Sequence, residues 1–135
     1  MRPNFSGLWN ANLAKSRLIG TPPKSVLFNI KHSDSDIATV MTVKTVDGSE
    51  HFIQFRGPIT GAEVSNEVLG QRWLSRLQWV GAELLIESWV NMAERQCHFC
   101  DFWSLAEDGK TLVMEHRDDD LKGQITFLER VREKE

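Results

Sequence analysis

Three side chains in this sequence are of the types needed for acid and base chemistry. His32 and His116 carry imidazoles, and Asp101 supplies a carboxylate. A carboxylate that orients an imidazole allows the ring to take or give a proton near neutral pH. If the fold brings the three together, they form an interior proton-transfer group. If it does not, they are hydrogen-bonded structural residues.

Two cysteines, Cys97 and Cys100, have the C-x-x-C spacing of redox pairs and of half a zinc site. The surrounding residues 94–105 are rich in aromatics and run into a turn at Glu-Asp-Gly, which indicates a strand. Positions three apart on a strand point to opposite faces and lie about 10 Å apart, beyond the roughly 7 Å limit for a disulfide. We therefore expect neither a redox pair nor a metal site.

Other catalytic and cofactor-binding motifs are absent from the sequence. It has no glycine-rich phosphate loop, no nucleophile elbow and no paired-histidine zinc helix. The acidic run at 118–120 lacks the spacing of a calcium loop. Sixteen basic and 19 acidic residues give a formal charge of −3, which offers no large positive field for nucleic acid. We expect no cofactor, no metal and no nucleic-acid partner.

Strands must position the candidate side chains, because apolar alternation with short polar breaks dominates and helical periodicity is almost absent. Turn residues fill the breaks, for example VDGS at 46–49 and AEDGK at 106–110. Such short breaks permit only antiparallel neighbours. The predicted strands are 5–12, 25–33, 36–46, 50–56, 62–69, 71–79, 83–92, 94–105, 110–117 and 123–132.

We expect these strands to close into a barrel, because an open meander of ten strands would expose two edges. The predicted fold is all-β: a single up-and-down antiparallel barrel of 8–10 strands, with residues 1–135 as one domain. Residues 13–19 allow at most one short helix, ended by Gly20 and the two prolines that follow.

Each strand of a barrel shows alternate residues to the interior. The predicted inward faces are mostly aliphatic and aromatic, with a few polar groups that must pair with each other, with water or with a ligand. The residues predicted to contact a ligand are Phe28, Ile30, His32, Trp73, Leu77, Ile86, Phe99, Asp101, Trp103, Met114 and His116.

The opening stretch FSGLW resembles the Gly-x-Trp signature of the calycin group, which includes lipocalins and fatty-acid-binding proteins. With VLFNIKH, WVGAELLIES and WSLAEDGKTLVMEHR, the resemblance runs nearly end to end and is nearest to bacterial lipocalin-like proteins. It implies that Trp9, with Phe5 and Gly7, closes one end of the barrel. It also implies that a late basic residue, Arg130 with Arg132 next, packs over the Trp9 ring.

Two departures from the fatty-acid-binding proteins limit what the resemblance implies about a ligand. Their helical lid is represented here only by residues 13–24, and their carboxylate-reading Arg-x-Tyr pair falls on Thr126 and Leu128. A fatty-acid carboxylate therefore has no expected anchor.

The leading hypothesis is a lipocalin-like protein that binds a small hydrophobic or aromatic molecule inside the barrel, without catalytic residues. The alternatives are a small barrel enzyme that uses the interior His and Asp side chains, and a filled barrel that acts as a protein-interaction module. Outward Leu85, Trp89 and Phe102 could form an apolar patch for a homodimer. Neither a membrane-inserting stretch nor a secretory signal is seen, so the expected location is the cytoplasm unless a leader was removed.

Overall fold

Ten antiparallel strands make up the fold. The computed structural model describes residues 3–18, 21–92, 95–106, 109–118 and 123–131. Glu94 and Arg132, at the ends of two predicted strands, lie outside these ranges. The strands are β1 (Gly7–Ala11), β2 (Ser25–His32), β3 (Asp36–Lys44), β4 (Glu50–Pro58), β5 (Glu63–Val68), β6 (Gln71–Val80), β7 (Glu83–Met92), β8 (Arg95–Leu105), β9 (Thr111–Arg117) and β10 (Gly123–Arg130).

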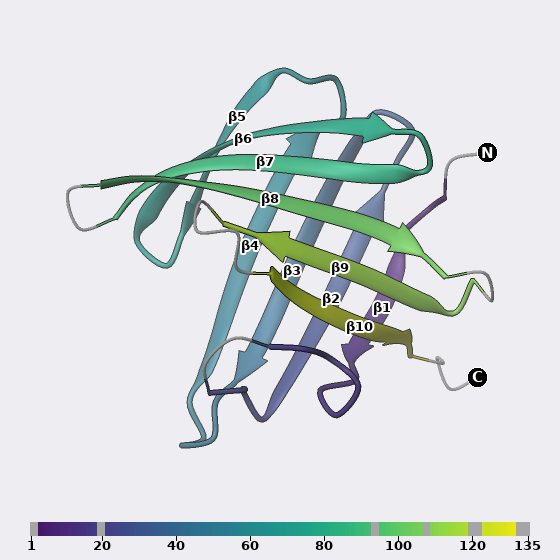
Figure 1. Cartoon of the computed structure of the whole chain (residues 1–135), viewed down its shortest axis with the longest axis vertical. Helices are drawn as coiled ribbons and strands as arrows, with labels where there is room; N and C mark the ends of the chain where they lie inside the picture. The colour runs from purple at the N-terminus through teal and green to yellow at the C-terminus, as the bar shows by residue number, and fades with distance from the viewer. Residues whose placement is uncertain (1–2, 19–20, 93–94, 107–108, 119–122, 132–135) are drawn as a thin grey trace.

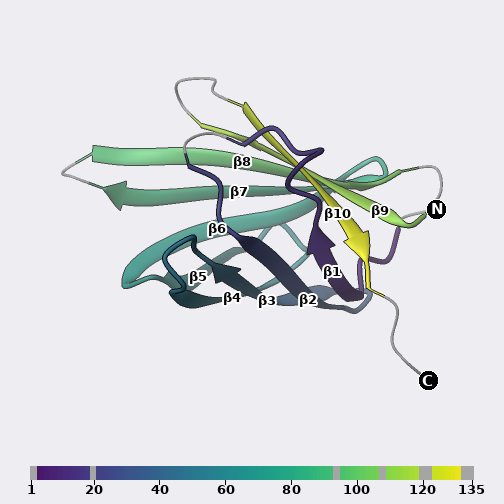
Figure 2. The ribbon, with the colours of Figure 1, turned by 90° about the horizontal axis from the view of Figure 1, so that it is seen from below.

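All ten strands belong to one sheet, in the order β4-β3-β2-β1-β10-β9-β8-β7-β6-β5. The pairing of β1 with β10 places Trp9 opposite Arg130 and joins the first strand to the last. Figures 1 and 2 show the sheet curled over on itself, with β2, β3 and β4 crossing behind β6, β7 and β8. The predicted all-β, up-and-down barrel is confirmed.

The barrel is nearly closed rather than fully closed by backbone hydrogen bonds, because β4 and β5 are the two ends of the sheet. The amide of Asn66 on β5 spans this seam: its Oδ1 accepts from the Arg56 N–H at 3.0 Å, and its Nδ2 donates to the Arg56 carbonyl at 2.9 Å. Gly57 lets β4 approach the side chains of β5 and β6. A Cβ at this position would lie 2.8 Å from Leu77 Cδ1 and 2.9 Å from Val64 Cγ1. Side chains thus replace a ladder at the seam.

The short helix allowed at 13–19 does not form in the described part of this segment, and Ile19 lies outside it. The chain makes one turn, in which the Ser16 N–H donates to the Asn12 carbonyl at 3.1 Å. It then pairs Arg17 with Ile125 of β10 through two backbone hydrogen bonds. Pairing with the sheet takes the backbone groups that a helix would use. No helix in the described ranges is long and apolar enough to span a membrane.

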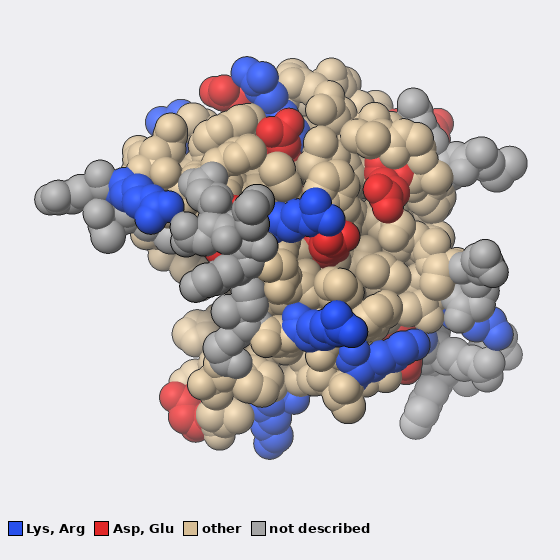
Figure 3. All heavy atoms as spheres, in the orientation of Figure 1, with Lys and Arg blue, Asp and Glu red and all other residues tan. Residues whose placement is uncertain are grey.

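The core fills one end of the barrel, near the β2–β3, β6–β7 and β8–β9 connections. Each fully buried apolar side chain there contributes roughly 1.5–3 kcal/mol to folding. The side chains with 2% exposure or less at this end are Phe5, Trp9, Ile30, Ile37, Leu77, Leu84, Leu112 and Leu128. On the face seen in Figure 3, basic and acidic side chains are interspersed, in keeping with the small net charge.

Candidate functional site

A cavity of about 550 Å³ occupies the other end of the barrel. It lies within the size range of small-molecule sites, which runs from roughly 300 to 1,000 Å³. Sixteen of its 23 lining residues are apolar, and all strands except β1 contribute to the lining. The barrel interior is therefore hollow at this end, which argues against the filled barrel considered from the sequence.

The segment that follows β1 forms part of the cavity lining. Leu13, Leu18 and the prolines 22 and 23 line the cavity from this segment. Leu69 in the β5–β6 turn also lines the cavity, and it is 67% exposed. Leu69 has a positive φ of 50°, a backbone conformation uncommon for a branched side chain. Of these lining side chains, Pro22 and Leu69 are exposed and the other three are partly buried.

Seven of the eleven residues predicted to contact a ligand line this cavity. They come from five strands, β2 and β6 to β9, whose inward faces converge above the packed core. These seven are Phe28, Trp73, Ile86, Asp101, Trp103, Met114 and His116.

The other four predicted residues lie elsewhere. Ile30 and Leu77 are buried in the packed end, so they support the cavity floor rather than its wall. Phe99 faces inward but is covered, since its ring stacks on Trp73 at 5.3 Å and lies 5.2 Å from the ring of His116. His32 stacks on Phe5 at 5.6 Å in the closed end. These positions share a face with the lining residues. Ile30, Leu77 and His32 lie deeper in the barrel, whereas Phe99 is covered by neighbouring rings.

His32 has a structural environment. Its Nδ1 accepts a hydrogen bond from the Phe5 N–H at 3.0 Å, and its ring lies 5.7 Å from that of Trp79. Burial lowers the pKa of His32, an effect opposed by the nearby carboxylates of Asp34 and Asp36. A neutral ring suits this position, because a protonated Nδ1 could not accept the hydrogen bond. The three-residue group of His32, His116 and Asp101 does not assemble.

Asp101 and His116 do come together, on the cavity wall. They are register partners on β8 and β9, and His116 Nδ1 lies 2.7 Å from Asp101 Oδ1. The hydrogen bond to Asp101 raises the pKa of His116, against the opposing effect of burial. Among the described residues His116 Nε2 has no hydrogen-bond partner. The pair thus offers the cavity one ring nitrogen in a fixed orientation.

A second polar feature of the wall is the indole of Trp73. Its Nε1 is buried and has no hydrogen-bond partner among the residues that the structure describes. An unpartnered buried donor costs roughly 1–3 kcal/mol. The nearby hydroxyls of Ser75 and Ser88 are 2.8 Å apart and satisfy each other. Trp73 Nε1–H is therefore a hydrogen-bond donor that a bound ligand with an acceptor could satisfy.

Much of the wall was not singled out from the sequence. Met41 and Val43 of β3, together with Ile53 and Phe55 of β4, line the cavity. Their alternation along the predicted strands 36–46 and 50–56 could have identified them as inward-facing, because the two residues of each pair share a face. The segment after β1 carried no such signal, because it has no strand periodicity.

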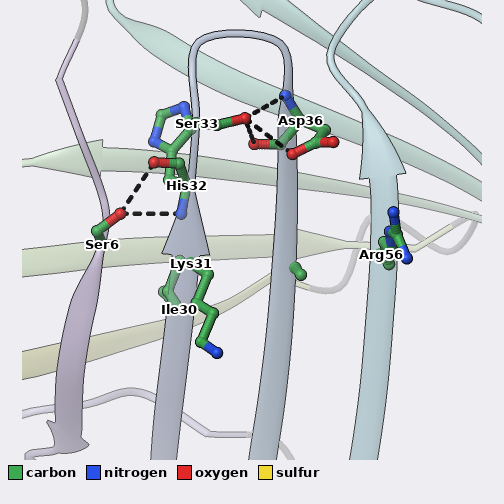
Figure 4. Close-up of a pocket in the computed structure, with 8 residues that line it drawn as sticks. Ser6, Ile30, Lys31, His32, Ser33, Asp36 and Arg56 are labelled. Carbon is green, nitrogen blue, oxygen red and sulfur yellow. Dashed lines mark hydrogen bonds between the residues drawn. The ribbon is translucent and has the colours of Figure 1, made fainter.

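A second hollow of about 370 Å³ lies outside the barrel, where β2 and β3 meet their connecting turn. In Figure 4 the side chains of Lys31 and Arg56 lie on strands separated by β3. The Ser6 hydroxyl donates to the His32 carbonyl at 3.0 Å, and Ser33 Oγ donates to Asp36 Oδ1 at 2.8 Å. The first hydrogen bond ties the segment before β1 to the end of β2, and the second belongs to the β2–β3 turn. Neither hydrogen bond involves Lys31 or Arg56, which also line this hollow.

The closed end has the contacts expected for barrel closure. Arg130 lies over the Trp9 ring, 4.3 Å from its centroid, and donates from Nη1 to the Ser6 carbonyl at 2.9 Å. Trp9 Nε1 donates to the Phe5 carbonyl at 2.9 Å. Gly7 has φ of 139°, and a Cβ there would lie 2.7 Å from Arg130 Nη1. Glycine thus gives the guanidinium room to lie across the indole.

Two solved structures share this fold. Secretory abundant heat soluble protein 4 from Ramazzottius varieornatus superposes with a TM-score of 0.67 at 11% identity, over 96% of each chain. A second secretory abundant heat soluble protein from that organism, crystallised from a dimer sample, gives 0.65 at 12% identity, over 97% of this chain and 98% of that chain. Both are lipocalin-like and fatty-acid-binding-protein-like barrels. No family model and no curated protein matches the sequence.

Proposed function

We propose that this chain binds one small, mostly apolar or aromatic molecule in the barrel cavity, with a hydrogen-bond acceptor placed against Trp73 and His116. The observation that carries the proposal is a cavity of about 550 Å³ with a largely apolar wall. The unpartnered Trp73 Nε1 supports the acceptor. The heat-soluble proteins support only the barrel fold, at identities of 11% and 12%. No ligand is carried over from them or from bacterial lipocalin-like proteins.

Apolar burial supplies most of the expected affinity. A ligand that loses roughly 300 Å² of apolar surface gains about 7.5 kcal/mol at ~25 cal/mol per Å². The cost of immobilising the ligand reduces this figure. A hydrogen bond from Trp73 to the ligand adds about 0.5–1.5 kcal/mol. Orientation therefore comes from the polar wall and affinity from the apolar wall.

Neighbouring residues on β3 provide a matched test. Met41 lines the cavity, whereas Val40 is 38% exposed on the outer face. Titration with 1-anilinonaphthalene-8-sulfonate, followed by probe fluorescence, should show saturable binding to the unmodified chain. Met41→Trp fills the cavity and should weaken binding at least about tenfold, the effect of about 1.4 kcal/mol. Val40→Trp should leave it unchanged.

Equal binding by both tryptophan variants would place the probe on the outer surface and contradict the proposal. Native mass spectrometry of the chain purified from its own host complements the titration by detecting a retained ligand. The same spectrum tests the predicted homodimer. One of the heat-soluble proteins was crystallised from a dimer sample. For this chain, dimerisation remains a prediction.

The His116–Asp101 pair favours a second candidate, an enzyme in which His116 takes a proton from a bound molecule. The 2.7 Å contact holds the imidazole in one orientation, as a general base requires. Incubation of the chain with its retained ligand discriminates the two candidates. A change in ligand mass that His116→Gln abolishes supports the enzyme, and an unchanged ligand supports binding alone.

A further inference from the structure

Three metal-ligating side chains meet on the outer surface of the barrel, away from the cavity. Glu87 of β7 and both His98 and Cys100 of β8 present a carboxylate oxygen, an imidazole nitrogen and a thiol sulfur, all within 4.8 Å of one another. We call these three residues the outer cluster. It has no part in the proposed ligand binding.

Strand register explains how the outer cluster assembles. Glu87 and Cys100 are directly opposed partners of the β7–β8 ladder. His98 is two residues before Cys100, so both side chains point to the same face of β8. Cys97 lies opposite Val90, which is 2% exposed, and faces the interior. The C-x-x-C spacing is thus divided between two faces, and the partner of Cys100 is a histidine.

The separations suit a single tetrahedral ion. Glu87 Oε2 lies 3.2 Å from His98 Nε2, which lies 3.8 Å from Cys100 Sγ. With Zn–N and Zn–O of about 2.0–2.1 Å and Zn–S of about 2.3 Å, tetrahedral ligands are spaced roughly 3.3–3.6 Å apart. All three donor atoms lie within 4.8 Å of one another, so rotations of the three side chains would bring them to these distances. The strands themselves need not move.

We propose that the outer cluster binds one divalent transition-metal ion of the Zn²⁺ class. The donor set of one thiolate, one imidazole and one carboxylate selects such ions over Mg²⁺ and Ca²⁺, which prefer oxygen ligands. Three protein ligands leave a fourth position for water or an external ligand. On binding, the Cys100 thiol gives up its proton to solvent as the metal–sulfur bond forms.

Neighbouring side chains hold the imidazole in place. Trp89 lies opposite His98 in the ladder, and the two rings stack at 5.2 Å with an interplanar angle of 24°. Arg76 lies over the other ring of this pair, 5.7 Å from the Trp89 centroid. The stack with Trp89 restricts rotation of the His98 ring. The half-buried Glu87 and His98, with side-chain exposures of 29% and 37%, leave the cluster accessible to an ion.

Two cationic residues flank the outer cluster: Arg76 lies opposite Glu87 on β6, and Arg117 lies opposite Cys100 on β9. Arg117 faces Cys100 across the β8–β9 ladder, but its guanidinium pairs with Glu115 at 2.6 Å and lies over Phe102. Its charge is balanced by that carboxylate. The outer apolar patch expected from the sequence is correspondingly reduced, because arginines cover the Trp89 and Phe102 rings.

Cobalt provides a direct test, because a thiolate bound to Co²⁺ gives a charge-transfer absorption in the near ultraviolet. The full reduced chain is titrated with Co²⁺ alone, in the presence of a non-thiol reductant. We expect the absorption to saturate at one ion per chain. Cys100→Ser should abolish it, and His98→Gln and Glu87→Gln should each weaken binding at least about tenfold.

Two matched controls separate the outer cluster from other thiols and histidines. Cys97→Ser retains the cluster and removes the inward thiol, and His51→Gln removes an exposed imidazole on β4. Both should bind Co²⁺ as the unmodified chain does. Absence of the absorption from the unmodified chain, its persistence in Cys100→Ser, or saturation at half an ion per chain would overturn the intrachain site.

Discussion

The pKa values of the two inward histidines, His32 and His116, are shifted in opposite directions because their partners differ. His116 shares its Nδ1 proton with the Asp101 carboxylate, which raises its pKa above the usual value for histidine. His32 accepts a hydrogen bond from a backbone N–H, and burial lowers its pKa. The charged form is thus stabilised at the cavity and destabilised at the closed end.

This difference predicts how stability depends on pH. A raised pKa in the folded state means that the His116–Asp101 pair contributes its full stabilisation below the unfolded-state pKa of about 6.5. The contribution disappears as pH rises through the folded-state pKa. We therefore expect His116→Gln to lower the free energy of unfolding most near pH 6 and least near pH 9. Urea unfolding at a series of pH values, followed by tryptophan fluorescence, measures this difference.

The exposed His51 supplies the control, since His51→Gln removes an imidazole without touching the pair. Its effect on unfolding should stay small and show no comparable decline with pH. A loss of stability in His116→Gln that grew with pH would contradict the assigned role of Asp101.

At the scale of elements, the seam between β4 and β5 is the least regular part of the sheet. Among the residues that the structure describes, the Asn66 amide makes two hydrogen bonds to the backbone of Arg56 across it. Asn66→Ala removes both hydrogen bonds and should lower the free energy of unfolding by about 0.5–1.5 kcal/mol, because water can replace the lost partners at this exposed position.

Amide hydrogen exchange at Arg56 gives the local measurement for this variant. We expect exchange there to accelerate in Asn66→Ala and to stay unchanged in Glu67→Ala, where an exposed neighbour is shortened. Unaltered exchange at Arg56 in Asn66→Ala would mean that the amide does not hold the seam.

Strands were predictable because alternation and turn residues are local signals. The ten expected strands form with small shifts in their ends, such as a first strand that begins at Gly7 rather than at residue 5. The turn at residues 13–18 was harder to predict, because its backbone partner, Ile125, is far away in the sequence. The seam depends on one side chain, Asn66, which no periodicity distinguishes.

For the whole molecule, the division into a packed end and a hollow end governs which inward residues line the cavity. Alternation identified the inward face of β2, yet Phe28 reaches the cavity while Ile30 and His32 lie deeper. The separation of His32 from His116 depends on how non-adjacent strands are placed around the barrel. Local sequence patterns do not encode that placement, so the face was predictable and the depth was not.

The central claim is that the hollow end receives a ligand whose acceptor pairs with Trp73. The indole N–H groups of Trp73 and Trp9 are both buried, but among the described parts of the chain only that of Trp9 has a partner, the Phe5 carbonyl. Trp9 is therefore an internal reference within the same molecule.

The most direct test is nuclear magnetic resonance of the ¹⁵N-labelled indole groups during titration with 1-anilinonaphthalene-8-sulfonate. We predict that the Trp73 Nε1–H signal shifts progressively to saturation, while the Trp9 signal keeps its position. Saturable probe binding that leaves the Trp73 signal unmoved, or that shifts both signals equally, would contradict ligand binding at this wall of the cavity.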